Sequence, residues 1–145
     1  MSGLHRTAGL LTALLVTGHW FPATAMAQAE DGRSTRVGVY TASQAQVGRE
    51  IYELSCMSCH TPASHAGPVF AAKWEGRPLW ELFRYVSDAM PKSDPGSLTE
   101  RQYVRVVAYL LKMNGMPAGS AELTADSLAL KRIRIELKAD TAHQR

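Results

Sequence analysis

Cysteine is scarce in this chain, with only two among 145 residues. This scarcity excludes a fold held together by several disulfides. A large excess of one charge is also missing, because 16 Lys and Arg residues face 13 Asp and Glu residues, for a formal net charge of +3. The longest basic run is Lys131-Arg132. The charge pattern therefore does not favour nucleic-acid binding.

Long hydrophobic runs are missing as well. The apolar stretch Ala8 to Val16 is too short to cross about 30 Å of hydrocarbon as a helix. It follows the weakly basic His5-Arg6 and precedes Ala25-Met26-Ala27, which fits the small-x-small cleavage pattern of a secretory signal. We therefore expect residues 1–27 to be a signal peptide, rather than a buried N-terminal helix, and the chain to be exported to the periplasm. Residues 28–145 then form a single domain.

The two cysteines stand in Cys56-Met57-Ser58-Cys59-His60, the Cys-x-x-Cys-His pattern of covalent c-type haem attachment. Cysteines three residues apart on a helical turn project to the same side. Their sulfurs can then reach the two vinyl groups of one porphyrin. His60 follows directly and is predicted to be the proximal iron ligand. The single motif predicts one covalent haem c.

Two other interpretations of the cysteines are less favoured. A thioredoxin-like redox disulfide needs a βαβ pattern, which the sequence lacks. A zinc site needs further cysteines or paired histidines at ligand spacing, and only His65 and His143 follow the motif. Haem attachment in an exported chain remains the best interpretation.

Hydrophobic spacing predicts a first helix over residues 43–54, with Val47, Ile51 and Leu54 on its inner face. Gly48 within it costs about 1 kcal/mol relative to Ala, a cost that a close crossing by another helix would offset. Near the other end of the chain, Ile133, Ile135 and Leu137 alternate with polar residues. This alternation predicts an extended tail that lies along the body of the domain.

Two further helices are predicted between these segments. One starts at Gly76-Arg77-Pro78, with proline at the first helical position, and its inner residues are Leu79, Leu82, Phe83 and Val86. The other has Thr99 as N-cap, Gln102 in a capping box and Leu98 stapled onto Tyr103. Its left-handed end is Asn114-Gly115. Its apolar face consists of Tyr103, Val106, Val107, Leu110 and Leu111.

From about Gln46 to Leu123 the chain resembles the class I cytochromes c. The resemblance is carried by the haem motif and by four later strings: Ala89-Met90-Pro91, Pro95-Gly96-Ser97-Leu98, Ala108-Tyr109-Leu110-Leu111 and Asn114-Gly115. It implies an all-α fold with three main helices around one covalent haem, formed by residues 28–145. It also implies membership of a branch of small periplasmic cytochromes that is often paired with quinoprotein or molybdenum dehydrogenases.

Three methionines are candidates for the sixth iron ligand. Met57 lies between the haem cysteines and cannot reach the far side of the ring. Met113 ends a helix, whereas Met90 and Met116 each precede a proline in a loop. The family pattern places the ligand at Met90. His65 is a poor alternative, because five residues from His60 are too few to pass around the porphyrin edge.

The surroundings of the haem are predicted by the same resemblance and by residue type. The carbonyl of Pro68, in the Gly67-Pro68 loop, is our candidate acceptor for the second N–H of the His60 imidazole. Trp74 is a candidate donor to a haem propionate. Basic side chains around the exposed haem edge would steer acidic partners, and the candidates are Lys73, Lys92 and Lys112.

A haem iron with histidine and methionine ligands has no free coordination position, which disfavours catalysis and suits one-electron transfer. We expect a periplasmic carrier between a dehydrogenase and an oxidase or another cytochrome. A tightly bound haem subunit of an oxidoreductase is the first alternative. A gas-binding or peroxidatic haem protein is the second, and Met90 argues against it.

The signal peptide and the haem motif together predict the mass of the mature protein. The exported protein should have lost residues 1–27 and gained one haem, measured by intact-protein mass spectrometry. Haem that acidic organic solvent extracts would contradict covalent attachment, and an N-terminus before Gln28 would contradict the cleavage site.

Overall fold

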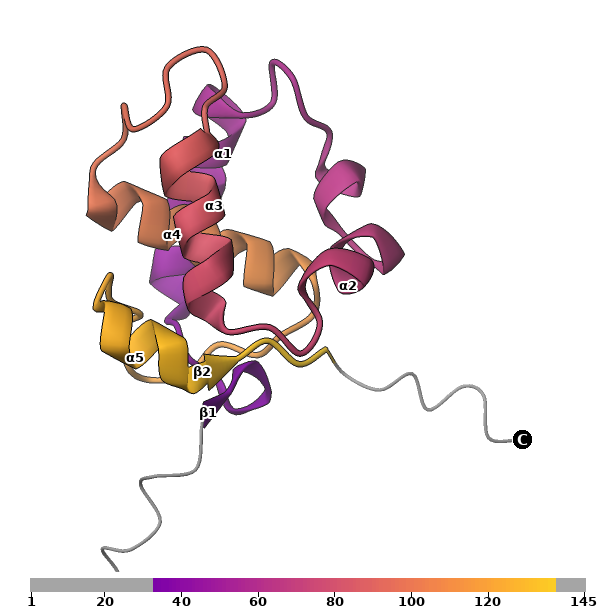
Figure 1. The fold of residues 1–145 in the computed structure, drawn as a ribbon, viewed down its shortest axis with the longest axis vertical. Coiled ribbons are helices and arrows are strands. Elements are labelled where there is room, and N and C mark those ends of the chain that lie inside the picture. Colours follow the sequence, from indigo (N-terminus) through magenta and orange to yellow (C-terminus); the bar gives the residue numbers. More distant parts are fainter. Residues whose placement is uncertain (1–32, 138–145) are drawn as a thin grey trace, which may run out of the picture. The chain divides into compact units, whose positions relative to one another are not determined.

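The computed structural model describes residues 33–137, and the expected signal peptide lies outside this range. The described chain is all-α, as predicted (Figure 1). Its helices are α1 (Ala42–Ser55), α2 (Pro68–Trp74), α3 (Leu79–Ala89), α4 (Glu100–Met113) and α5 (Ser127–Arg132), with 3-10 turns at Thr35–Val37 and Pro62–His65. None of the helices in residues 33–137 has the length and apolar character needed to cross a membrane.

Helices α1 and α4 cross at Gly48. A Cβ atom placed on Gly48 would lie 1.8 Å from the carbonyl oxygen of Arg105 and 3.1 Å from the Cβ of Tyr109, both on α4. The two backbones therefore touch, which confirms the close crossing expected at this glycine. Next to this contact, the rings of Tyr52 and Tyr109 lie 5.4 Å apart between their centroids.

The expected inner face of α1 was wrong at Leu54, whose side chain is 86% exposed. The buried residues of this helix are Gln44, Ala45, Gly48 and Tyr52. Ala45, Gly48 and Tyr52 recur at helical spacing, but their side chains differ greatly in size. Gly48 faces α4 because only a residue without a Cβ atom lets the two backbones approach this closely. Leu54 lies on the part of α1 that faces solvent.

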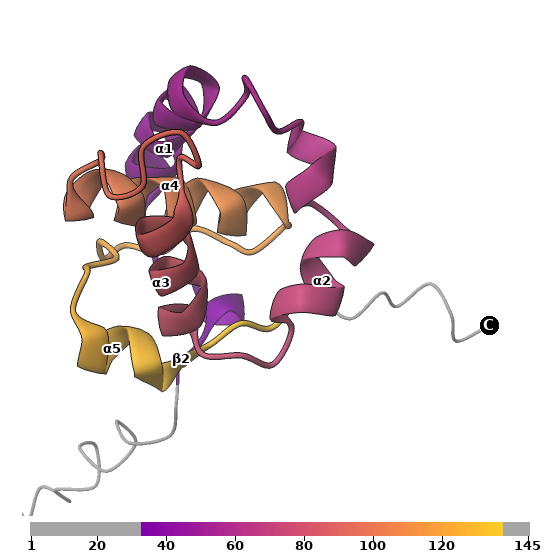
Figure 2. The same ribbon diagram turned by 45° about the horizontal axis from the view of Figure 1, so that its top comes forward.

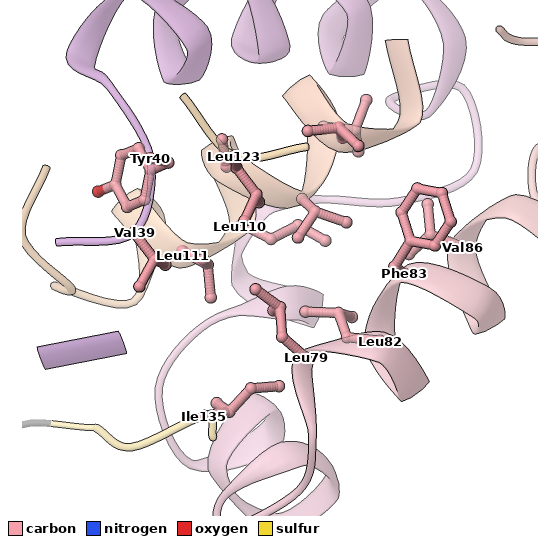
Figure 3. Packing of buried hydrophobic residues seen from close by; sticks show 14 of the residues in the cluster. Val39, Tyr40, Leu79, Leu82, Phe83, Val86, Leu110, Leu111, Leu123 and Ile135 are labelled. Atoms are coloured by element: carbon pink, nitrogen blue, oxygen red, sulfur yellow. The ribbon is translucent and has the colours of Figure 1, made fainter. Parts of the chain in front are cut away.

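Helix α3 packs on α4 and α5. Its buried residues are the four inner residues that its sequence predicted: Leu79, Leu82, Phe83 and Val86. In Figure 3, Leu79 and Leu82 point towards Leu110 and Leu111. Leu79 and Leu111 are fully buried. The helix begins one residue later than predicted, because Pro78 is its N-cap rather than its first residue.

Helix α4 begins and ends as predicted. The Thr99 hydroxyl accepts the Gln102 N–H, and the Gln102 side chain accepts the Thr99 N–H at 2.8 Å, which completes the capping box. All five residues of the predicted apolar face are buried. The helix ends before Gly115, whose φ of 77° is left-handed.

The end of the described chain runs back along the domain in an extended conformation, as predicted. Strand β2 (Ile133–Arg134) pairs in parallel with β1 (Arg33–Ser34), a ladder that the sequence pattern did not predict. Ile135 is fully buried, and its N–H donates to the Arg77 carbonyl at 2.9 Å. Figure 2 shows α5 and α2 on opposite sides of α3, with β2 near the start of α3.

The crossing at Gly48 generates a stability prediction. Gly48→Ala should lower the free energy of unfolding by about 2 kcal/mol or more, because overpacking against a backbone outweighs the gain in helix propensity. Ser43→Ala, at an exposed position of α1, is the matched control and should change stability by less than about 0.5 kcal/mol. Urea unfolding followed by circular dichroism measures both, and a more stable Gly48 variant would contradict the tight crossing.

Candidate functional site

One cavity brings together residues from most of the described chain. It contains about 1060 Å³ of empty space, counted out to its open mouth. Its walls come from the end of α1, the turn after it, α2, α3, the loop after α3, and α4. Cys56, Cys59, His60, Trp74 and Met90 all line it, so most of the predicted site residues meet here.

The Cys-x-x-Cys-His motif forms a turn that continues from the end of α1. The Cys56 N–H donates to the Tyr52 carbonyl at 2.9 Å, and the Cys56 carbonyl accepts the N–H groups of Cys59 at 3.1 Å and His60 at 3.0 Å. The turn places both thiols and the imidazole at one wall of the cavity. Cys56 is half-buried and Cys59 is exposed. Burial raises the pKa of the Cys56 thiol.

Met90 is the methionine that shares the cavity with this turn. It directly follows α3, and its N–H still donates to the Val86 carbonyl at 3.2 Å. Met116 is buried in the hydrophobic core, where its carbonyl accepts the Tyr40 hydroxyl at 2.6 Å. Neither Met113 nor Met116 lines the cavity, and Met57 is 48% exposed.

Trp74 and Pro68 have different positions relative to the cavity. Trp74, at the end of α2, is buried and lines the wall, with its ring 5.6 Å from that of Tyr85. The Lys73 ammonium lies 3.6 Å from the centroid of the Tyr85 ring. Pro68 is the first residue of α2, is exposed and does not line the cavity. The role predicted for its carbonyl stays a prediction.

Two of the three predicted lysines lie at this cavity. Lys73 and Lys92 are exposed and line it, whereas Lys112, in the last turn of α4, does not. The lysines that line the cavity are therefore Lys73, on α2, and Lys92, in the loop after Met90.

His65 also lines the cavity, although the sequence predicted no role for it there. Its ring lies 4.5 Å from that of His60 and 6.0 Å from that of Tyr52. Burial, followed by the neighbouring His60 and Lys73, lowers the pKa of His65, which favours the neutral imidazole. Burial, with smaller contributions from Cys56 and Tyr109, raises the pKa of Tyr52 to about 12.

Asn114 fixes the loop that follows His60. Its amide nitrogen donates to the His65 carbonyl at 2.9 Å and to the Leu110 carbonyl at 2.8 Å, and its amide oxygen accepts the Gly67 N–H at 2.9 Å. The sequence predicted Asn114 as part of a helix end. The sequence around Asn114 could not predict its contact with the loop, because the two are 47 to 49 residues apart in the chain.

The residues of this cavity fit a covalently bound haem. Two thiols three residues apart can each form a thioether, the adjacent imidazole is a nitrogen donor, and Met90 supplies a thioether. Much of the remaining wall is apolar, as a porphyrin requires, and includes Val69, Phe70, Leu82, Val86, Val106 and Leu110.

Comparison with known proteins agrees with this chemistry. A family model described as cytochrome c oxidase, cbb3-type, subunit III, matches residues 43–110. No curated protein and no solved structure shows a significant match. The matched segment contains the haem motif, α3, Met90 and most of α4. The all-α fold, the Cys56–His60 turn and this match together support a class I c-type cytochrome.

Proposed function

We propose that this cytochrome is a periplasmic one-electron carrier and not an enzyme. One haem c would be held through thioethers of Cys56 and Cys59, with His60 and Met90 as the protein ligands to its iron. The observation that carries the proposal is the position of Met90, which lines the same cavity as the Cys-x-x-Cys-His turn, while Met113 and Met116 lie elsewhere.

Each of these side chains has a definite task. Haem, when bound, supplies a one-electron couple between Fe(III) and Fe(II). Cys56 and Cys59 would fix the haem to the chain, and His60 and Met90 would be the two protein ligands to its iron, which would leave O₂ and peroxide no position to bind. The Met90 thioether favours the lower oxidation state. The apolar wall formed by Phe70, Leu82 and Val86 would exclude water from the haem, and Trp74, which also lines the cavity, would donate to a propionate.

The partners are proposed from the charges at the cavity. Lys73 and Lys92 are exposed there and favour an acidic surface on the partner, through an encounter that salt weakens. We assign a periplasmic dehydrogenase as the electron donor and an oxidase or another cytochrome as the acceptor.

A second candidate function is that of a tightly bound haem subunit in an oxidoreductase complex. The description of the matching family model, an oxidase subunit, favours it. Purification of the native protein from its source distinguishes the two functions, because a subunit co-purifies with a large catalytic chain at physiological salt and a diffusing carrier does not.

The Met90 assignment predicts a specific spectrum. The ferric protein should show the weak sulfur-to-iron absorption band in the far red. Met90→Ala should abolish this band and lower the reduction potential, because a soft thioether stabilises Fe(II). Both properties are measured on the haem-loaded protein, by absorption and by redox titration.

Met116→Ala is the matched control for this prediction. It should keep the band while lowering the free energy of unfolding by roughly 2–5 kcal/mol, because it removes a buried side chain. Loss of the band in the Met116 variant and its retention in the Met90 variant would reverse the assignment.

The carrier function predicts how the reduced protein reacts. It should pass electrons rapidly to an oxidase or a second cytochrome in stopped-flow mixing, and should bind CO poorly at neutral pH because both axial positions are occupied. Met90→Ala should bind CO readily. Fast, stoichiometric CO binding by the unmodified protein would favour the gas-binding alternative instead.

A further inference from the structure

Tyr103 lies in the first turns of α4 and directs its hydroxyl to the loop that carries Met90. Its side chain is only 3% exposed. The hydroxyl donates to the Met90 carbonyl at 2.7 Å and accepts the backbone N–H of Leu98 at 3.4 Å. A phenolic oxygen can donate one hydrogen bond and accept another at the same time. One side chain therefore joins both ends of residues 90–98.

The loop between these two ends has few other attachments. Residues 92–97 are all exposed. Its backbone bonds are local, from the Asp94 N–H to the Pro91 carbonyl at 3.0 Å and from the Ser97 N–H to the Asp94 carbonyl at 3.3 Å. Within the described residues 33–137, the bond from Leu98 to Tyr103 is the only hydrogen bond that ties residues 91–98 to the rest of the protein.

We propose that Tyr103 is a positioning residue for the sixth iron ligand. By closing residues 90–98 into a fixed loop, its hydroxyl keeps the Met90 main chain against α4 and the Met90 side chain in the cavity. Tyr103 does not line the cavity itself, so it acts on the iron site through Met90. The inference rests on the proposed ligation by Met90.

The chain offers a closely matched control. Tyr40 is 1% exposed, and its hydroxyl donates to the carbonyl of another methionine, Met116, at 2.6 Å. Tyr103→Phe and Tyr40→Phe therefore each remove one buried hydroxyl and one hydrogen bond to a methionine carbonyl. Only the first of these bonds holds the loop that carries Met90.

The test follows imidazole binding to the ferric, haem-loaded protein by stopped-flow absorption. Imidazole enters only when Met90 leaves the iron, so the apparent association rate reports how often the loop opens. Tyr103→Phe should raise this rate about fivefold or more, because it removes both the hydrogen bond to the Met90 carbonyl and the longer one from the Leu98 N–H. Tyr40→Phe should leave it at the wild-type value. Amide hydrogen exchange should become faster at Leu98 in the Tyr103 variant only.

Three outcomes decide against the proposal. Equal acceleration of imidazole binding in both variants would mean that general stability, and not Tyr103, controls the loop. Wild-type rates in both variants would mean that the loop is held without the hydroxyl. In either case a far-red band in the wild-type protein leaves the carrier function intact. Absence of that band from the wild-type protein would overturn the ligation by Met90 and this inference with it.

Discussion

The contact between the backbones of α1 and α4 at Gly48 is the constraint on which the rest of the structure depends. The Arg105 carbonyl occupies the space that a Cβ atom of residue 48 would need. Backbone atoms cannot change rotamer, so this contact has less freedom to adjust than one between side chains. It fixes the end of α1, which continues into the Cys56 turn, relative to Val106 and Leu110 of α4, which also line the cavity.

Helix α4 uses this fixed position to hold both sides of the site. Near its start the Tyr103 hydroxyl binds the loop that contains Met90, and just past its end the Asn114 amide binds the loop that follows His60. Both side chains bond to main-chain groups rather than to side chains. They therefore fix the course of each loop through its backbone, and this contact does not depend on which side chains the loop residues carry.

The sequence allowed good predictions wherever the signal was local. The capping box at Thr99 and Gln102 involves residues three apart, and covalent attachment requires Cys56 and Cys59 to be three apart, so both features are visible in a short window. The predicted inner face of α1 was wrong at Leu54 because hydrophobic spacing identifies a buried face by its large apolar residues. The actual contact selects small ones, Ala45 and Gly48. Such a selection depends on Arg105 and Tyr109 of a neighbouring helix, 57 and 61 residues after Gly48 in the chain.

The polar contacts of the site could not be predicted for the same reason. His65 lies beside His60 because of a 3-10 turn, and no hydrophobic period marks a turn of four residues. The Asn114 contact joins segments 47 to 49 residues apart. A single sequence contains no information that pairs such positions, even when both residue types are noted individually.

The two sides of the site consequently differ in how their ligands are held. His60 directly follows Cys59, so its place is set by the same turn that presents the thiols. Met90 is far from that turn in sequence, and its place depends on the packing of α3 and on the closed loop after it. Local opening begins where few buried contacts hold the chain, which here is the exposed segment 92–97. The haem would therefore stay attached while the sixth ligand exchanges. Substitutions of Lys92 would therefore change both how readily Met90 leaves the iron and the positive charge offered to an acidic partner. The covalent attachment at Cys56 and Cys59 would not change.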